Sequence, residues 1–323
     1  MKNLHPDHPH WVPPHCPSDD CPSNTDSDTE WRFKRNGKKV RVSDGLRYQQ
    51  FTCKICGVYF SSRTFCGDYW LKRRDAYKQI MTLSANGMCN RQIARHLKVS
   101  PSTVDRHVER IGRQCLLFHA EVMKDYTPPK TIVVDGFQTY ELSKYFPCDF
   151  NVAVAKDEGF FLWFTDSPLR RSGKHTEYQK KRRAELEAKF GRPDPQAVRK
   201  DMQELLEVVA LGGRGIQLIS DEHLSYPPAV RAVNQMSVAM HGIKAIVHHE
   251  RIPSKLFRDR NNKMWEVNLL DGLIRHSEAN HKRKTWASAK RRNMAALRLV
   301  IYLVCRNYLW PRWAKSCKKT PAM

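Results

Sequence analysis

The sequence predicts an α/β domain, with a mixed sheet and flanking helices, that follows two smaller N-terminal modules. Short apolar runs alternate with helical stretches after Pro128-Pro129, which is the pattern of a sheet covered by helices. Two pairs of cysteines lie near the N-terminus, and a two-helix pattern lies between them and the sheet. We therefore divide the chain into residues 1–68, 69–126 and 127–323, the last with a charged helical insert at about 167–212.

The charge of the chain indicates an anionic partner. Its 323 residues include 56 Lys and Arg against 33 Asp and Glu, a formal net charge of +23. Nucleic acid is the first candidate for so basic a chain. The N-terminus is rich in His and Pro rather than apolar, and the apolar segment Met294–Trp310 is short and contains Arg298 and Arg306. We therefore expect no membrane partner.

The ten cysteines are too few for a dense disulfide framework in a chain of this length, which indicates a reducing compartment. The pairing of some of them indicates a metal site. Four of them form two pairs, Cys16 with Cys21 and Cys53 with Cys56. Two such pairs can close one tetrahedral Zn²⁺ site, and the second pair precedes Gly57 in a tight CxxC-Gly knuckle. The first pair is more widely spaced, so His15 is an alternative ligand. We expect Cys66 to be a core residue.

Residues 90–111, NRQIARHLKVSPSTVDRHVERI, have helix-turn-helix form. Asn90 can cap the first helix, Lys98-Val99-Ser100 makes the turn, and Ser100 or Ser102 caps a second helix that begins at Pro101. The outward face of a second helix with this composition fits the major groove of DNA. The DNA-contacting residues expected on it are Ser102, Thr103, Arg106, His107 and Arg110. The alternative is an ordinary helical hairpin, which would use the same apolar residues as core.

Five strands are expected in the sheet: Thr131–Asp135, Phe150–Ala155, Gly159–Thr165, Ile216–Ser220 and Lys244–Val247. The first three follow one another closely and predict an antiparallel meander. Helices are expected over Lys174–Leu211 with a break at Pro193 and Pro195, and over Pro227–Met240, Lys263–His281 and Lys290–Leu309. The alternating lysines, arginines and glutamates of the insert are typical of a solvent-exposed helix.

Two predicted strands end on an acid, Asp135 in the first and Asp221 after the fourth. An unpaired buried carboxylate is costly, which favours a metal-ligand role, although an Asp that starts a turn with Gly136 is the alternative. If the first and fourth strands are neighbours, both carboxylates meet, and with a third they would hold two divalent cations about 4 Å apart. Oxygen ligands favour Mg²⁺, or Mn²⁺. Asp149 and Asp166 also lie at strand margins and are expected to be turn residues.

The order of zinc ribbon, helix-turn-helix and strand-end acids resembles bacterial insertion-sequence transposases with a ribonuclease-H-like DDE catalytic domain. The resemblance covers nearly the whole chain. It implies an enzyme of the DDE or DDD type that binds terminal inverted repeats and catalyses metal-dependent strand cleavage and strand transfer on double-stranded DNA. It also implies a homodimer or higher oligomer on DNA, located in the cytoplasm at the nucleoid.

The segment IRHSEANHKRKTWASAK carries the most specific part of this resemblance. Related transposases place a catalytic Glu seven residues before the arginine that corresponds to Arg275, and an Asn three residues after that Glu. Here those positions hold Asn268 and Asp271, so the acid and the amide are exchanged. Positions three apart share a helix face, so Asp271 is the expected third catalytic acid, with Glu278 as the alternative. The resemblance also implies phosphate contacts by Arg275, Arg283, Lys284 and Lys290.

The exchange of acid and amide leaves a second function open. A DNA-binding regulator, or a domesticated transposase with an inactive nuclease fold, would keep the same modules without needing the third acid. Cleavage of inverted-repeat DNA separates this alternative from an active transposase.

Overall fold

The computed structural model describes residues 5, 6, 8, 10–26, 28–42, 45–127, 129–210, 215–242, 246–282, 285–311 and 320–322. The chain divides into two compact units, Met1–Lys78 and Gln79–Met323. The helix-turn-helix and the large sheet both fall in the second unit. The division into three domains stays a prediction.

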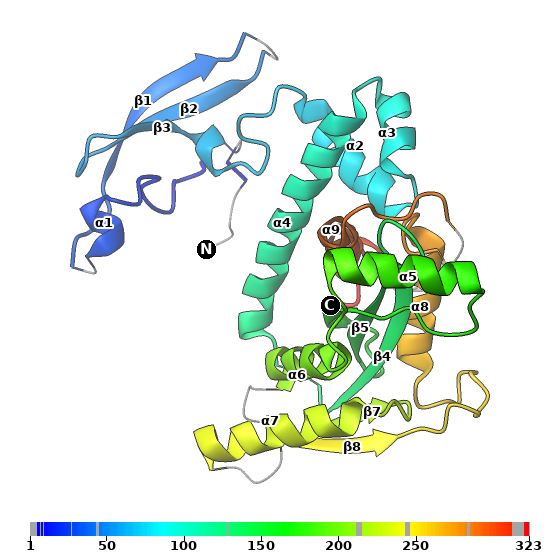
Figure 1. Cartoon of the computed structure of the whole chain (residues 1–323). Helices are drawn as coiled ribbons and strands as arrows, with labels where there is room; N and C mark the ends of the chain where they lie inside the picture. Colours follow the sequence, from blue (N-terminus) through cyan, green and yellow to red (C-terminus); the bar gives the residue numbers. More distant parts are fainter. Residues whose placement is uncertain are drawn as a thin grey trace. The chain divides into compact units, whose positions relative to one another are not determined.

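The first unit contains a three-stranded antiparallel sheet (Figure 1). Its strands are β1 (Phe33–Val40), β2 (Arg47–Cys53) and β3 (Tyr59–Ser61), in the order β1-β2-β3, with a short helix α1 (Pro22–Thr25) before them and a 3₁₀ turn η1 (Ser62–Phe65) after them. Trp11, Phe51 and Phe60 form its apolar core. The rings of Phe51 and Phe60 stack with centroids 5.4 Å apart. Most of β1 is exposed, so its basic side chains face solvent.

Three helices open the rest of the chain: α2 (Arg74–Ala85), α3 (Asn90–Leu97) and α4 (Pro101–Asp125). Ser100 caps α4 as predicted, because its Oγ accepts a hydrogen bond of 3.1 Å from the Thr103 N–H. The expectation that Asn90 caps α3 is wrong. Cys89 is the N-cap, and the Asn90 amide instead donates to Asp105 Oδ1 at 2.6 Å.

Helix α4 runs for 25 residues, well beyond the helix-turn-helix pattern. It packs along α9 (Arg292–Val304). The crossing is close at Gly112, where an added Cβ would lie 2.7 Å from Leu297 Cβ. Further along α4, buried His119 donates through Nε2 to the Leu162 carbonyl (2.7 Å), and its Nδ1 accepts a hydrogen bond from Tyr308 Oη (2.8 Å). One helix therefore belongs to both the helix-turn-helix and the layer that covers the sheet.

The second unit is built on a five-stranded mixed sheet of order β6-β5-β4-β7-β8. The strands are β4 (Thr131–Tyr140), β5 (Pro147–Ala155), β6 (Phe161–Pro168), β7 (Ile216–Ser220) and β8 (Val247–Arg251). β4, β5 and β6 pair antiparallel, whereas β7 is parallel to β4 and β8 is parallel to β7. The predicted meander and the predicted adjacency of the first and fourth strands are both confirmed.

Four strands differ from their predicted bounds. β5 begins at Pro147, three residues before the predicted start, and β6 runs over Phe161–Pro168 instead of Gly159–Thr165. β4 continues five residues past Asp135, because Phe137 and Thr139 remain buried after the apolar run ends. Asp135 therefore lies in the middle of a strand and not at its end. β8 begins at Val247, so His248 lies inside the strand; Lys244, where the prediction placed its start, lies outside the described residues.

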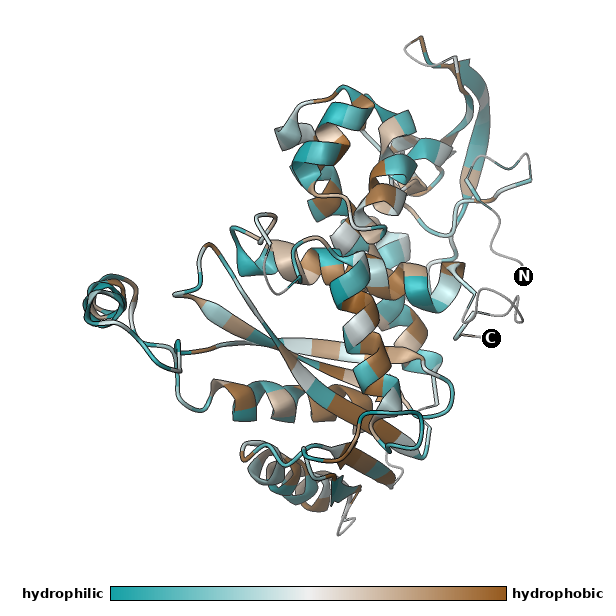
Figure 2. Ribbon diagram, turned by 90° about the vertical axis from the view of Figure 1, so that its right-hand side faces the viewer, coloured by the Kyte–Doolittle hydropathy of each residue, from teal (hydrophilic) through white to brown (hydrophobic). Residues whose placement is uncertain are grey.

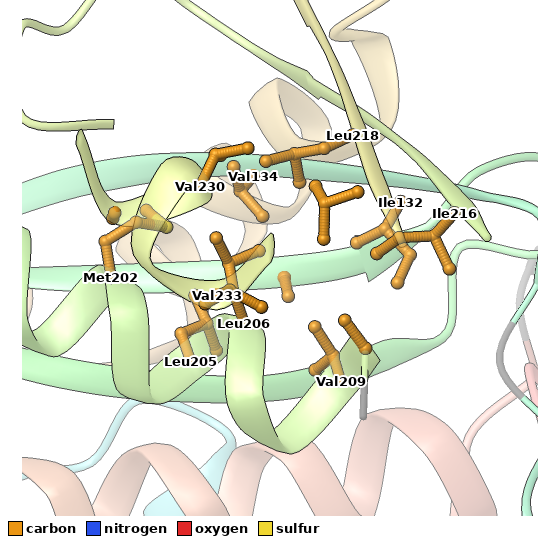
Figure 3. Packing of buried hydrophobic residues seen from close by; sticks show 14 of the residues in the cluster. Ile132, Val134, Met202, Leu205, Leu206, Val209, Ile216, Leu218, Val230 and Val233 are labelled. Carbon is orange, nitrogen blue, oxygen red and sulfur yellow. The ribbon is translucent and has the colours of Figure 1, made fainter. Parts of the chain in front are cut away.

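Helices α6 (Ala197–Ala210) and α7 (Tyr226–His241) cover one face of the sheet. Figure 3 shows side chains from α6, α7, β4 and β7 packed together; those labelled are Ile132, Val134, Met202, Leu205, Leu206, Val209, Ile216, Leu218, Val230 and Val233. The prediction that the whole insert faces solvent is thus wrong for α6. It holds for α5 (Glu177–Phe190), in which no residue is buried.

Helix α8 (Trp265–Ser277) packs on β4 and β5, and α9 is followed by a π-helical turn η2 (Cys305–Leu309). Figure 2 shows apolar residues concentrated in the strands and in the helices that cover them. Among the described residues, no helix is both long and apolar enough to cross a membrane.

Candidate active site

Asp135 lies at the point where the sheet loses one of its strands. Pairing between β4 and β7 extends to Val133 opposite Ile219, and β7 ends one residue later, at Ser220. Asp135 is 8% exposed, and its Oδ1 accepts a hydrogen bond of 2.8 Å from the Gly136 N–H. The parallel register places Asp221, the residue after β7, beside Asp135.

Asp221 is held by a turn. Its Oδ1 accepts a hydrogen bond of 2.9 Å from the His223 N–H, which fixes the carboxylate just past the end of β7. The turn with Gly136 that was the alternative role for Asp135 does not form, because β4 continues through Gly136 to Tyr140. A local turn forms at Asp221 instead. It does not compete with a ligand role, because the second oxygen of the carboxylate stays available in this geometry.

The three predicted acids act on one another electrostatically. The pKa of Asp135 is raised to about 7, chiefly by burial and then by the carboxylates of Asp221 and Asp271, whereas the Gly136 N–H and Arg258 oppose the shift. Asp271 reaches this position from α8, the helix that packs on β4. β4, β7 and α8 thus bring to one place three side chains that are far apart in sequence.

Glu278, the alternative third acid, is engaged elsewhere. It follows α8 directly and is fully buried, with its Oε2 3.3 Å from Arg298 Nε. The pKa of Glu278 is raised to about 7, because burial outweighs the opposing effect of Arg298. The charges that most affect Asp135 are those of Asp221 and Asp271. The geometry therefore favours Asp271 over Glu278 as the third member.

Sequence reasoning missed Asp149. It was expected in a turn, but it lies inside β5 opposite Gln138 and is 6% exposed. Its Oδ1 is buried and has no hydrogen-bond partner among the described residues. The pKa of Asp149 is raised to about 6, chiefly by burial and then by Asp271 and Asp221, whereas Arg275 opposes the shift. The only sequence signal was Gly136, since a glycine inside a strand often marks a close approach.

Asp166, also expected in a turn, lies in β6 and pairs with Arg292 at 2.7 Å, away from these acids. Tyr226 is a second residue that sequence reasoning missed. It begins α7, it is 1% exposed, and burial raises the pKa of its phenol well above the usual value. Four carboxylates add to that shift: Asp135, Asp149, Asp221 and Asp271. Tyr226 therefore lies near all four carboxylates.

The donor set of this cluster suits a hard cation, because carboxylate oxygens are the ligands that Mg²⁺ prefers. Within the described residues, the group of His, Cys, Asp or Glu ligand atoms that all lie within 4.8 Å of one another is Cys16, Cys21, Cys53 and Cys56. The three aspartates are more widely spaced than that. A pair of ions about 4 Å apart needs such a wider set, because each carboxylate need reach only one or both ions and not a single shared centre.

The four cysteines predicted as metal ligands come together. Cys16 Sγ lies 3.6 Å from Cys56 Sγ, and Cys21 Sγ lies 3.8 Å from Cys53 Sγ. Zn–S bonds of about 2.3 Å in a tetrahedron separate the sulfurs by about 3.8 Å, so the spacing fits zinc. The knuckle also forms, since the N–H groups of Ile55 and Cys56 point to Cys53 Sγ at 3.3 and 3.4 Å.

His15 takes no part in this cluster. Its Nδ1 contacts the carbonyl oxygen of its neighbour Cys16 at 2.8 Å, and its ring packs edge-on against Phe65. Cys66 is buried, as predicted, with its Sγ near the Ser62 carbonyl (3.7 Å).

The predicted DNA-contacting face of α4 is only partly exposed. Ser102 and Arg106 are exposed, whereas Thr103 and Arg110 are half-buried. The expectation that His107 shares this face is wrong. It is 6% exposed, and its Nδ1 bonds to the Thr103 carbonyl at 2.7 Å, because it lies on the side of α4 that carries the buried residues Val104 and Val108.

The predicted phosphate-contacting residues have different positions. The Arg275 guanidinium lies over the Phe137 ring at 5.5 Å and within 3.5 Å of the Gln138 carbonyl, beside β4. Lys290 lines a cavity at the far end of β4. Arg283 and Lys284 lie outside the described residues.

The helix-turn-helix prediction is confirmed by comparison with known families, because a helix-turn-helix domain family matches residues 78–110. No curated protein matches the chain. Among solved structures, the chain is similar to a piggyBac transposase in a synaptic complex with hairpin DNA, at 12% identity and a TM-score of 0.39. That alignment covers 72% of this chain and 63% of the piggyBac chain.

Two further structures are similar at lower scores. One is an intasome of simian T-cell lymphotropic virus in complex with the PP2A regulatory subunit B56 gamma, at 13% identity and a TM-score of 0.26, covering 76% of this chain and 70% of that chain. The other is the catalytic domain of Mos1 mariner transposase, at 11% identity and a TM-score of 0.21, covering 61% of this chain and 90% of that chain.

Proposed function

We propose that the protein is a DNA transposase of the insertion-sequence type. It binds the terminal inverted repeats of its element and cuts and joins DNA strands at Asp135, Asp221 and Asp271. The observation that carries this proposal is the gathering of these three acids, one of them buried at mid-sheet with its pKa raised to about 7. A helix-turn-helix in the same chain and a net charge of +23 support DNA as the substrate.

Each acid has a distinct support. β4 holds Asp135 rigidly at mid-sheet, the turn to His223 fixes Asp221, and α8 carries Asp271. Together they would hold Mg²⁺ or Mn²⁺. The cations, when bound, supply Lewis-acid activation of the phosphodiester and of the attacking oxygen.

DNA recognition is assigned to α4 and to the first unit. Ser102 and Arg106 are exposed on the first turns of α4, where a recognition helix meets base edges in the major groove. Zn²⁺ held by Cys16, Cys21, Cys53 and Cys56 would stabilise the three-stranded unit as a zinc ribbon. The exposed basic residues of β1 would then meet DNA phosphates. The enzyme is expected to act as a dimer or higher oligomer on DNA.

The sheet is proposed to be ribonuclease-H-like. Its three antiparallel strands precede two parallel ones, with the first strand at the centre. Helices α5 and α6 fill the region between β6 and β7, so the insert consists of one exposed helix and one helix that packs on the sheet.

The test is magnesium-dependent cleavage of DNA that carries the inverted repeats flanking the gene. We expect the Asp135→Asn variant to lose cleavage and strand transfer while its binding in a gel-shift assay is unchanged. Asp166→Asn is the matched control, because that carboxylate lies in β6, is paired with Arg292, and should not affect cleavage.

Three other outcomes would each change the assignment. Cleavage by Asp135→Asn would remove Asp135 from the site. Binding without any cleavage by the wild type, in Mg²⁺ or in Mn²⁺, would indicate a DNA-binding regulator with an inactive nuclease fold. Cleavage that never leads to strand joining would indicate a nuclease.

A further inference from the structure

A cavity of about 380 Å³ lies between the hairpin that joins β4 to β5 and the exposed helix α5. Its walls come from the hairpin, from the end of β6 and from α5, with Lys290 at one side. It begins at Glu141, the residue that follows β4. No predicted site residue other than Lys290 belongs to it.

The cavity has an excess of positive charge that its own acids do not neutralise. Its lining includes five basic residues, Arg170, Arg171, Arg183, Arg192 and Lys290, and two acids, Glu141 and Glu187. Both acids are already engaged. Glu187 accepts a bidentate pair of hydrogen bonds from Arg170 at 2.8 and 3.1 Å. Glu141 Oε2 accepts a hydrogen bond of 2.8 Å from the backbone N–H of Arg292.

Three of the five cations form no ion pair with any acid that the structure describes. The Arg171 guanidinium lies over the Tyr145 ring, 4.5 Å from its centroid. Arg192 and Lys290 make no ion pair with any residue in the described parts of the chain. Cations in this state at the wall of a cavity favour a phosphate group as the ligand.

Aromatic faces lie among these cations. Tyr145, Phe146 and Phe190 line the cavity, and the rings of Phe146 and Phe190 meet edge to face at 5.7 Å. Phe190 is 61% exposed at the end of α5, a helix in which no residue is buried. Aromatic rings interleaved with arginines are the recognition surface of unpaired bases, which stack on the rings while the cations hold the backbone.

We propose that this cavity binds an unpaired nucleotide of a DNA strand, with its base against Phe190 and Tyr145 and its phosphate against Arg171, Arg192 and Lys290. Its volume is near the lower end for ligand pockets, which leaves room for a base and its phosphate but not for a duplex. The inference deepens the proposed function, because it rests on DNA as the substrate. Glu141 is six strand residues from Asp135, roughly 20 Å along β4, so the nucleotide would lie several steps from the cleaved bond.

The test is binding of a fluorescent single-stranded oligodeoxythymidine of about ten nucleotides, a length within the site size of single-strand-binding folds. Fluorescence anisotropy on the full chain with zinc and without magnesium keeps binding separate from cleavage. We expect Phe190→Ala and Arg192→Ala each to weaken binding about tenfold. Their matched controls on α5, Tyr178→Ala and Arg182→Ala, should bind like the wild type, because neither residue lines the cavity.

A second readout locates the base directly. Ultraviolet cross-linking of an oligonucleotide that contains 5-iodouracil should attach it to Tyr145 or Phe190, as identified by mass spectrometry. Wild-type affinity in both Phe190→Ala and Arg192→Ala would overturn the inference. An equal loss of duplex binding in these variants would overturn it too, since the cavity would then contact paired DNA.

Cleavage assayed in parallel separates the two proposals. If the wild type cleaves inverted-repeat DNA while the cavity variants bind single strands normally, only the cavity assignment fails. If single strands bind through the cavity but no cleavage occurs, only the transposase activity fails.

Discussion

The carboxylate of Asp149 occupies the space that a side chain at position 136 would need. A Cβ built on Gly136 would lie 2.5 Å from Asp149 Oδ2, closer than real Cβ contacts. Because partners in an antiparallel ladder share a face, Asp149 and its partner Gln138 lie on the face opposite to Asp135. At this point β4 carries Asp135 on one face, and Asp149 of β5 packs against Gly136 on the other.

Replacement of Gly136 by Ala should therefore destabilise the second unit. The added methyl group displaces a buried carboxylate, and overpacking of this kind costs about 1–3 kcal/mol. Urea unfolding measures the free energy of unfolding. Asp149→Ala supplies the check, because Gly136→Ala should cost much less in that background. An equal cost in both backgrounds would show that Asp149 is not what excludes a side chain at 136. Gly272→Ala, where nothing lies within 4 Å, is the control.

Arg298, in α9, hydrogen-bonds to the α2–α3 region of the helix-turn-helix. It is 5% exposed, and it donates to the carbonyls of Ser84 (3.0 Å) and Met88 (2.8 Å), to Asn90 Oδ1 (2.5 Å) and to Glu278 (3.3 Å). Loss of one partner from a buried ion pair costs about 3–5 kcal/mol, so Arg298→Met should be strongly destabilising.

The matched variant for Arg298→Met is Arg298→Met with Glu278→Gln. It removes both charges and should recover part of the lost stability, as measured by urea unfolding. If the double variant is no more stable than the single one, the cost comes from the lost hydrogen bonds to the α2–α3 region and not from the buried charge of Glu278.

The acids and the strand pattern illustrate how much the sequence could predict. The apolar run Ile132–Val134 predicted β4. The acids that follow this run and the run in β7, Asp135 and Asp221, were predicted to be metal ligands. Ser100 as the cap of α4 was readable because capping is local. The length of β4 was not readable, since the strand continues through alternating burial that a short apolar run does not reveal.

The misses share one cause, which is tertiary context. Asp149, in PCDFNVAVA, precedes its apolar run and gave no local sign that β5 begins two residues earlier. His107 was assigned to the outer face because it is polar, yet α4 extends far beyond the motif and buries that side. Asn90 is of a residue type that often caps helices, but its side chain hydrogen-bonds to Arg298 and Asp105 instead. Such partners lie as many as 208 residues away.

Zinc removal should affect the first unit selectively. Cys56→Ser removes one of four thiolates, so we expect the purified variant to contain less than one zinc ion per chain and its first unit to lose stability. Zinc content by metal analysis and protease resistance of residues 10–68 are the measurements. Cys66→Ser is the control, because Cys66 is buried near the Ser62 carbonyl and outside the cluster. Equal zinc contents in both variants would contradict the four-cysteine assignment.

His281 should make the second unit sensitive to acid. It is fully buried, and its ring meets the stacked rings of Phe137 (5.3 Å) and Phe150 (5.1 Å) edge to face. Burial lowers its pKa to about 3, with Arg298 and Arg275 contributing. An unfolded histidine has a pKa of about 6.5. A lowered folded pKa means that the unfolded chain binds the extra proton, so stability is full above pH 6.5 and falls as the pH drops toward 3.

The variant His281→Gln removes this dependence. The slope is at most about 1.36 kcal/mol per pH unit, so between pH 6.5 and pH 5 the wild type should lose up to about 2 kcal/mol more than the variant. Glu278 acts in the opposite direction, since its raised pKa of about 7 adds stability as the pH falls from 7. It is present in both proteins and cancels in the comparison. Urea unfolding at the two pH values gives the difference, and parallel losses would mean that His281 is charged in the folded protein.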